Sequence, residues 1–221
     1  MLANYKEILK KSRKRVLELA NDVLKAYGLS IEAFETGDIE KATQARAMLK
    51  DAHDRNSKID NEIIKTLALF SPEARDLRVV IAHLKIASEL TRISDYVRTY
   101  AKNVKMSISG DFEIEGLKED TLSFNQSTYK SLKAAVDAIE ADSEESLENI
   151  YRQVNVEVSK CDDIYSILEQ NIVQQICITP ESARDFIYFH KSMRKVERIS
   201  DRSVNIVKLA YFAQKGGKLK L

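Results

Sequence analysis

Glu197 and Asp201 have the residue types and spacing best suited to binding chemistry in this 221-residue chain. They lie four residues apart in a stretch with helical periodicity, so both carboxylates should project from one face of a helix. Such a pair repels itself unless a neighbouring arginine or a bound cation lies between its members. Hard cations bind oxygen clusters of this kind, and iron or manganese also accept them. Glu157 and Asp162 on the preceding predicted helix would enlarge the cluster if the two helices pack laterally.

The first half of the chain carries a poorer version of this pattern. Asp95 matches the second member of the pair, but a threonine replaces the first member. On the preceding predicted helix, Asp51 and Asp54 share a face, and Asp54 would lie roughly opposite Asp95 in an antiparallel hairpin. Because 31% of the residues are charged, an ordinary solvated helix face is the alternative interpretation in both halves.

Catalytic patterns are missing from the sequence. None of His53, His83 and His190 follows a glutamate by three positions, as a di-iron bundle requires, so we interpret them as packing or surface residues. There is no Gly-rich phosphate loop and no nucleophile elbow. Cys161 and Cys177 match no zinc or redox spacing and are expected to be free thiols in a reducing cytosol. We therefore expect no enzymatic activity and no organic cofactor.

An internal duplication organises these residues. The tetrapeptide Arg-Ile-Ser-Asp occurs at 92–95 and again at 198–201, an offset of 106 residues. Each copy lies late in a long apolar-and-charged stretch that begins with a Pro-Glu step, at Pro72 and at Pro180. Two halves that share one fold can place similar polar sites in related positions.

Six long helices are expected to position these residues. The chain has only 6 Gly and 2 Pro, and apolar residues recur at three- and four-residue steps. Asp38 and Ser71 are candidate N-caps, and the turn at 141–144 is expected to contain a further cap. The predicted fold class is all-α, with two tandem three-helix bundles related by duplication; a single continuous bundle is the alternative. The predicted bundles cover residues 1–107 and 117–215, with a linker at 108–116.

Charge and hydropathy limit the classes of partner. The net charge of +1 produces no global field that would favour nucleic acid. No apolar run approaches the roughly 20 residues that span a bilayer, and the N-terminus lacks signal-peptide features, so we expect a cytoplasmic protein. The basic N-terminal stretch could touch anionic lipid or an acidic partner, or it could be a solvated helix face. Its cations are Lys6, Lys10, Lys11, Arg13, Lys14 and Arg15.

The motif regions resemble the PhoU family, regulators of bacterial phosphate uptake and signalling. Residues 71–78, Ser-Pro-Glu-Ala-Arg-Asp-Leu-Arg, are similar to that family's Gln-Pro-x-Ala-x-Asp-Leu-Arg at the start of the third helix. Residues 196–201, Val-Glu-Arg-Ile-Ser-Asp, are similar to its Glu-Arg-Ile-Gly-Asp, with serine in place of glycine. Length, repeat and helix order agree over nearly the whole chain.

This resemblance implies two three-helix bundles, a homodimer, no catalytic activity, and iron, zinc or another divalent metal held by Glu/Asp-x-x-x-Asp motifs. The intact motif is Glu197 with Asp201, whereas the first repeat keeps only Asp95. The middle-helix motif has imperfect counterparts. These are Asp51 with Asp54, and Glu157 with Asp162.

The resemblance also implies a role. The protein would be an adaptor between a phosphate transporter's ATPase subunit and a sensor histidine kinase, and a negative regulator of phosphate-starvation signalling and phosphate uptake. It would bind no nucleic acid and would contact the membrane only through its partners. The alternatives are an accessory protein of a Pit-type phosphate or ion transporter, and a metal-binding protein with carboxylate clusters.

Overall fold

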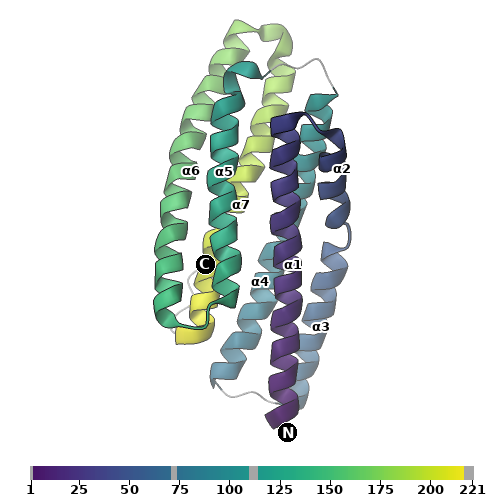
Figure 1. Cartoon of the computed structure of the whole chain (residues 1–221), viewed down its shortest axis with the longest axis vertical. Coiled ribbons are helices and arrows are strands. Elements are labelled where there is room, and N and C mark those ends of the chain that lie inside the picture. The colour runs from purple at the N-terminus through teal and green to yellow at the C-terminus, as the bar shows by residue number, and fades with distance from the viewer. Residues whose placement is uncertain (1, 71–73, 110–113, 217–221) are drawn as a thin grey trace.

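The structure, a computed structural model, describes residues 2–70, 74–109 and 114–216, and this part of the chain is all-α, as expected. Figure 1 shows the helices running along the long axis of an elongated molecule. No described helix is long and apolar enough to cross a membrane. The α-helices are α1 (Leu2–Thr36), α2 (Ile39–Met48), α3 (Ala52–Phe70), α4 (Ala74–Ile108), α5 (Lys118–Glu140), α6 (Glu144–Ile178) and α7 (Ala183–Lys215), with short 3₁₀ turns at Glu115–Leu117 and Pro180–Ser182.

The helices form two bundles that lie side by side. Helices α1 to α4 form the first bundle and α5 to α7 form the second. The bundles join where α1 packs against α5 and where α4 packs against α7, and both pairs are antiparallel (Figure 1). One hydrophobic core continues through both bundles, so the duplicated halves are packed together as a single body.

The predicted second helix is interrupted, which corrects the expectation of one continuous element. It consists of α2 and α3, separated by a turn at 49–51. Leu49 in this turn is fully buried, and Asp51 stands directly before the first residue of α3. Aspartate favours turns and helix starts over helix interiors because its side chain competes for nearby backbone groups. The turn resets the helical phase, and this changes which side chains of α3 face α4.

The cap at Asp38 is confirmed, and Ser143 provides the cap expected in the turn at 141–144. Asp38 Oδ1 accepts hydrogen bonds from two backbone N–H groups in the first turn of α2, at 2.9 and 3.1 Å. Ser143 Oγ accepts one from the first turn of α6 at 3.2 Å. The third candidate, Ser71, lies outside the described residues. These short local bonds satisfy N–H groups that have no partner within the helix.

Helices α1 and α5 approach closely at Gly28. A Cβ atom at this position would lie 3.3 Å from Cε2 of Tyr129 on α5. The adjacent Tyr27 is fully buried, and its hydroxyl donates to Oδ1 of Asn125 at 2.9 Å. The contact between the bundles is therefore hydrogen-bonded as well as apolar.

Candidate functional site

In each Arg-Ile-Ser-Asp copy the two middle residues are buried, and the final aspartate is partly exposed to solvent. The isoleucine and the serine of both copies are at most 1% exposed. The side chains of Asp95 and Asp201 are 45% and 43% exposed. Packing thus accounts for the middle of the motif, and the aspartates are the members available for chemistry.

The residues around the motifs reveal an approximate two-fold relationship between α4 and α7. Tyr96 and Arg202, which occupy equivalent positions, are in contact, with the guanidinium carbon 5.6 Å from the ring centroid. Nη1 of Arg202 donates to Oε2 of Glu89 at 2.7 Å. The equivalent of Glu89 is Lys195, and its Nζ lies 5.6 Å from the centroid of Tyr96. Contacts between α4 and α7 therefore occur in pairs related by the repeat.

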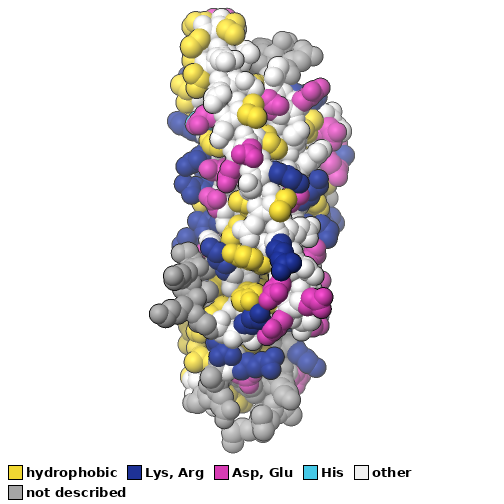
Figure 2. Space-filling model, turned by 90° about the vertical axis from the view of Figure 1, so that its left-hand side faces the viewer, with side chains coloured by type: hydrophobic (Ala, Val, Ile, Leu, Met, Phe, Trp, Pro, Cys, Tyr) yellow, Lys and Arg dark blue, Asp and Glu magenta, His cyan; other side chains and the backbone are white. Residues whose placement is uncertain are grey.

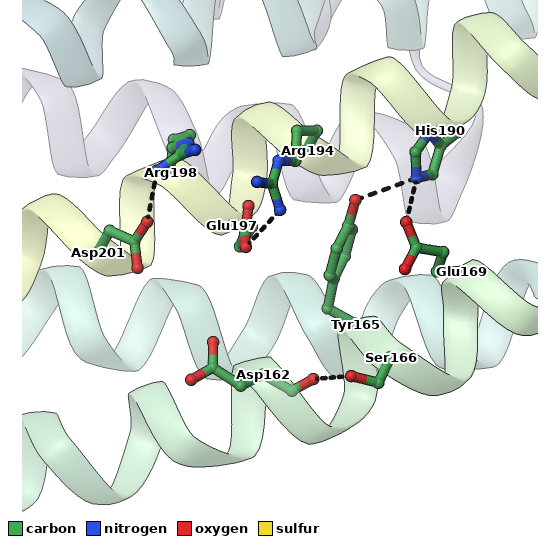
Figure 3. A network of polar contacts seen from close by, with 9 residues as sticks. All are labelled: Asp162, Tyr165, Ser166, Glu169, His190, Arg194, Glu197, Arg198 and Asp201. Carbon is green, nitrogen blue, oxygen red and sulfur yellow. Dashed lines mark hydrogen bonds and ion pairs between the residues drawn. The ribbon is translucent and has the colours of Figure 1, made fainter.

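Three carboxylates of the second repeat project toward one another from facing helices, as Figure 3 shows. Asp162 comes from α6, and Glu197 and Asp201 come from α7; we call these three the carboxylate cluster. Oε1 of Glu197 accepts a hydrogen bond from Nη1 of Arg194 at 2.7 Å. Oδ2 of Asp201 accepts one from Nη1 of Arg198 at 3.2 Å. The predicted pair thus lies on one face, with an arginine on each carboxylate.

The carboxylate cluster holds more negative charge than its arginines neutralise. Burial raises the pKa of Glu197, and the charges of Asp201 and Asp162 act in the same direction, whereas Arg194 opposes them. Burial and then the charges of Asp201 and Asp163 raise the pKa of Asp162. In addition, the buried Oε2 atom of Glu197 has no hydrogen-bond partner. A cation at this position would stabilise the ionised forms.

The fit of this site to a metal ion is partial. Carboxylate oxygens are suitable donors for a hard or intermediate cation, and the unpartnered Oε2 of Glu197 is available as a ligand. In the described part of the chain, however, no three His, Cys, Asp or Glu side chains are arranged to hold a metal. Binding would require Arg194 and Arg198 to move away from the carboxylates that they now contact.

Glu157 is buried, unlike Asp162, with which the sequence paired it. Glu157 is 8% exposed, and Nζ of Lys160 donates to its Oε1 at 2.9 Å. Asp162 is mostly exposed and only partly buried, and the five residues that separate it from Glu157 correspond to a rotation of about 140° along the helix. The two side chains therefore do not share a face of α6.

In the first repeat a histidine occupies the place expected for a carboxylate. Nε2 of His53 lies 3.0 and 3.1 Å from the two oxygens of Asp95. Asp54 is exposed on α3, and Asp51 lies in the turn before it. Neither aspartate side chain has a hydrogen bond or ion pair among the described residues. The equivalent of His53 in the second repeat is Ser159, so comparing the two repeats could not predict this contact.

A second polar network joins α6 and α7 beside the carboxylate cluster (Figure 3). Nε2 of His190 lies 3.1 Å from the hydroxyl of Tyr165 and 2.9 Å from Oε1 of Glu169. The guanidinium of Arg194 lies over the Tyr165 ring, 5.9 Å from its centroid. These contacts hold Arg194 beside Glu197 and connect the two helices.

Comparison with known proteins finds similarity to one family. Residues 16–104, which cover most of the first bundle, match the model of the PhoU domain. The first bundle is therefore similar to a PhoU domain, and curated PhoU proteins extend the similarity over nearly the whole chain. It is 23% identical over 218 residues to the phosphate-specific transport system accessory protein PhoU homolog of Rhizobium meliloti (strain 1021), which covers 99% of this chain and 90% of that protein. It is 26% identical over 209 residues to the corresponding Serratia marcescens protein, covering 94% of this chain and 83% of the relative.

Solved PhoU structures share the fold over almost the full length. The phosphate transport system regulatory protein PhoU from Streptococcus pneumoniae superposes with a TM-score of 0.83 at 21% identity, covering 98% of this chain and 100% of that one. PhoU from Pseudomonas aeruginosa superposes with a TM-score of 0.76 at 22% identity, covering 98% of both chains. The all-α architecture of duplicated bundles is therefore the PhoU fold.

Proposed function

We propose that this protein is a non-enzymatic regulator of phosphate homeostasis in the cytoplasm. It acts as an adaptor between a phosphate transporter's ATPase subunit and a sensor histidine kinase, and it restrains phosphate-starvation signalling when phosphate is plentiful. The full-length similarity to relatives named as accessory proteins of phosphate-specific transport carries this proposal. The shared PhoU fold supports it.

Deleting the gene tests the regulatory role. Phosphate-starvation transcripts and phosphate uptake should both rise in phosphate-replete medium, and the wild-type gene supplied in trans should restore them. Unchanged transcripts together with unchanged uptake would show that the protein regulates neither.

We infer that protein partners dock on the outer face of α6. Val156, Ile167 and Ile178 are 54%, 54% and 69% exposed. They follow one another at intervals of eleven residues, about three helical turns, so they form one stripe. Figure 2 views the molecule from the α6 side, and apolar side chains are spaced along this face. Exposed apolar side chains gathered on one face are typical of protein-interaction surfaces.

A triple serine variant tests this docking face. Val156→Ser, Ile167→Ser and Ile178→Ser should weaken binding to the purified ATPase subunit or kinase at least tenfold while the circular dichroism stays unchanged. The control, Ile64→Ser with Leu69→Ser, removes apolar side chains that are 59% and 73% exposed on α3. Equal loss of binding affinity in both variants would show that the outer face of α6 is not the docking surface. Binding only to a Pit-type permease would instead favour the alternative transporter system.

The carboxylate cluster supports metal binding as a second candidate function. The unpartnered Oε2 of Glu197 and the raised pKa of Glu197 and Asp162 carry it. Protein reconstituted with iron or zinc should retain about one ion per chain, and Glu197→Gln with Asp201→Asn should lose it. The matched control, Asp51→Asn with Asp54→Asn, should retain the ion. Metal content that neither double change alters would exclude the cluster as the site.

A further inference from the structure

Helices α4 and α7 concentrate positive charge in a chain that is nearly neutral. Helix α4 contains seven Lys and Arg against three Asp and Glu, and α7 contains eight against three. Their net charges are +4 and +5, so the pair carries +9 in a chain whose total is +1. The rest of the chain therefore carries −8, and the charge is strongly separated between parts of the molecule.

Part of this positive charge lies on one outward face. On α7, residues 184, 188, 191, 195, 198 and 202 recur at alternating four- and three-residue steps, which keeps them on one side of the helix. In Figure 1, α4 and α7 lie behind α1 and α5, and Lys and Arg side chains line the corresponding left-hand edge of Figure 2. We define the α4–α7 basic face by five of the cations on these two helices that have no acidic partner. These are Lys85, Arg92, Arg184, Lys191 and Lys195.

The cations of this face are available to bind an external partner, in contrast to several of those in the N-terminal stretch. Within the described residues, no ion pair or hydrogen bond reaches the five side chains of the α4–α7 basic face. In α1, by comparison, Arg13 donates to two carbonyl oxygens at the end of α5, and Arg15 pairs with Glu62 at 2.6 Å. Two cations of the basic N-terminal stretch, Arg13 and Arg15, therefore already have partners within the chain.

Aromatic side chains lie between these cations. The ring of Tyr188 has Arg184 at 5.7 Å and Lys191 at 5.5 Å from its centroid. Because cations already occupy positions over the ring, it is a poor platform for stacking nucleic-acid bases. Tyr188 is nevertheless 54% exposed, and the adjacent Ile187 is 46% exposed. An amphipathic aromatic ring flanked by Lys and Arg is typical of side chains at a membrane–water interface.

We propose that the α4–α7 basic face binds directly to a bilayer surface that contains anionic phospholipids. Two antiparallel helices of 35 and 33 residues, each about 50 Å long, present an extended face suited to a flat partner. Each Lys or Arg near an anionic bilayer strengthens binding by about fivefold. This inference goes beyond the proposed adaptor function, in which the membrane is reached only through partner proteins.

Vesicle co-sedimentation tests the proposal with matched charge changes. The full-length protein should bind vesicles of phosphatidylcholine with phosphatidylglycerol at low ionic strength, and should bind phosphatidylcholine alone poorly. Removing three cations from the face should weaken binding about 100-fold, and 0.5 M salt should weaken the wild type because exposed charges are screened. The face variant combines Arg184→Gln, Lys191→Gln and Lys195→Gln. The control variant replaces exposed lysines on α1, α3 and α5 and combines Lys25→Gln, Lys58→Gln and Lys130→Gln.

A fluorescence measurement tests the orientation independently. The chain contains no tryptophan, so Tyr188→Trp introduces a single reporter. Its emission should shift to shorter wavelength when anionic vesicles are added, whereas Tyr151→Trp on α6 should not respond. The proposal is overturned by absence of vesicle binding at low salt, by equal weakening in both triple variants, or by equal binding to neutral vesicles. Tight binding to duplex DNA without binding to vesicles would also overturn it, because the face would then serve nucleic acid.

Discussion

At the scale of residues, the two motif aspartates have different electrostatic surroundings. His53 contacts both oxygens of Asp95, so this side chain is already satisfied by a neighbouring helix. Asp201 has a single arginine contact and two further carboxylates nearby, Glu197 and Asp162. Binding of a cation should therefore be more favourable beside Asp201 than beside Asp95.

A buried histidine provides a residue-scale prediction about stability. His83 is 6% exposed, and burial followed by the charge of Arg13 lowers its pKa from 6.5 to about 4. Between these values the unfolded chain binds a proton that the folded protein does not, so stability falls as the pH decreases from about 6.5 to 4. The loss should be about 2 kcal/mol at pH 5.

Replacing His83 with the residue from the equivalent position of the second repeat, Phe189, isolates this effect. Urea unfolding of His83→Phe should show little change in stability between pH 7 and pH 5, apart from a shared background from other groups. The change at pH 7 should be small, since only the contact between His83 and Ser12, at 3.2 Å, is lost. An undiminished difference between the two pH values would exclude His83 as its origin.

At the scale of elements, helix starts and interruptions decide which side chains meet. The caps at Asp38 and Ser143 involve neighbouring residues; the sequence identified Asp38 and, for the second cap, the turn at 141–144. The turn at 49–51 contains neither Gly nor Pro, so the sequence pattern predicted a continuous helix across it. After the turn the phase of α3 differs from that expectation, so His53 rather than Asp54 faces Asp95.

Helix capping supplies the prediction at this scale. Asp38→Ala should lower the free energy of unfolding by about 1 kcal/mol, because two N–H groups in the first turn of α2 lose their acceptor. Asp38→Asn keeps an acceptor oxygen and should stay within a few tenths of a kcal/mol of the wild type. Equal losses for both substitutions in chemical denaturation would indicate that the charge of Asp38, rather than the cap, contributes the stability.

At the scale of the whole molecule, the contact between α4 and α7 joins the duplicated halves. Glu89 and Arg202 pair across it at 2.7 Å, with side chains only 14% and 18% exposed. This contact and the α1–α5 contact continue one core across both bundles. The homodimer implied by the family resemblance stays a prediction, which sedimentation velocity can test.

A double-mutant cycle tests how much the Glu89–Arg202 pair contributes. Arg202→Met should destabilise the protein by about 3 kcal/mol, because Glu89 keeps a poorly solvated charge without a partner. Glu89→Gln combined with Arg202→Met should recover part of that loss, since no unpaired charge remains. Strict additivity of the single changes in urea unfolding would show that the two residues are not coupled.

The sequence by itself determined the features that depend on neighbouring residues. Helical periodicity, the cap at Asp38, the capped turn at 141–144, the duplication and the shared face of Glu197 and Asp201 follow from spacings of a few residues or from a simple repeat. The structure decided what depends on helix packing: the burial of Glu157, the contact between His53 and Asp95, and the gathering of cations on the α4–α7 basic face. These join residues far apart in the chain. Their geometry depends on where each helix is interrupted and how it rotates against its neighbours, which local periodicity does not encode.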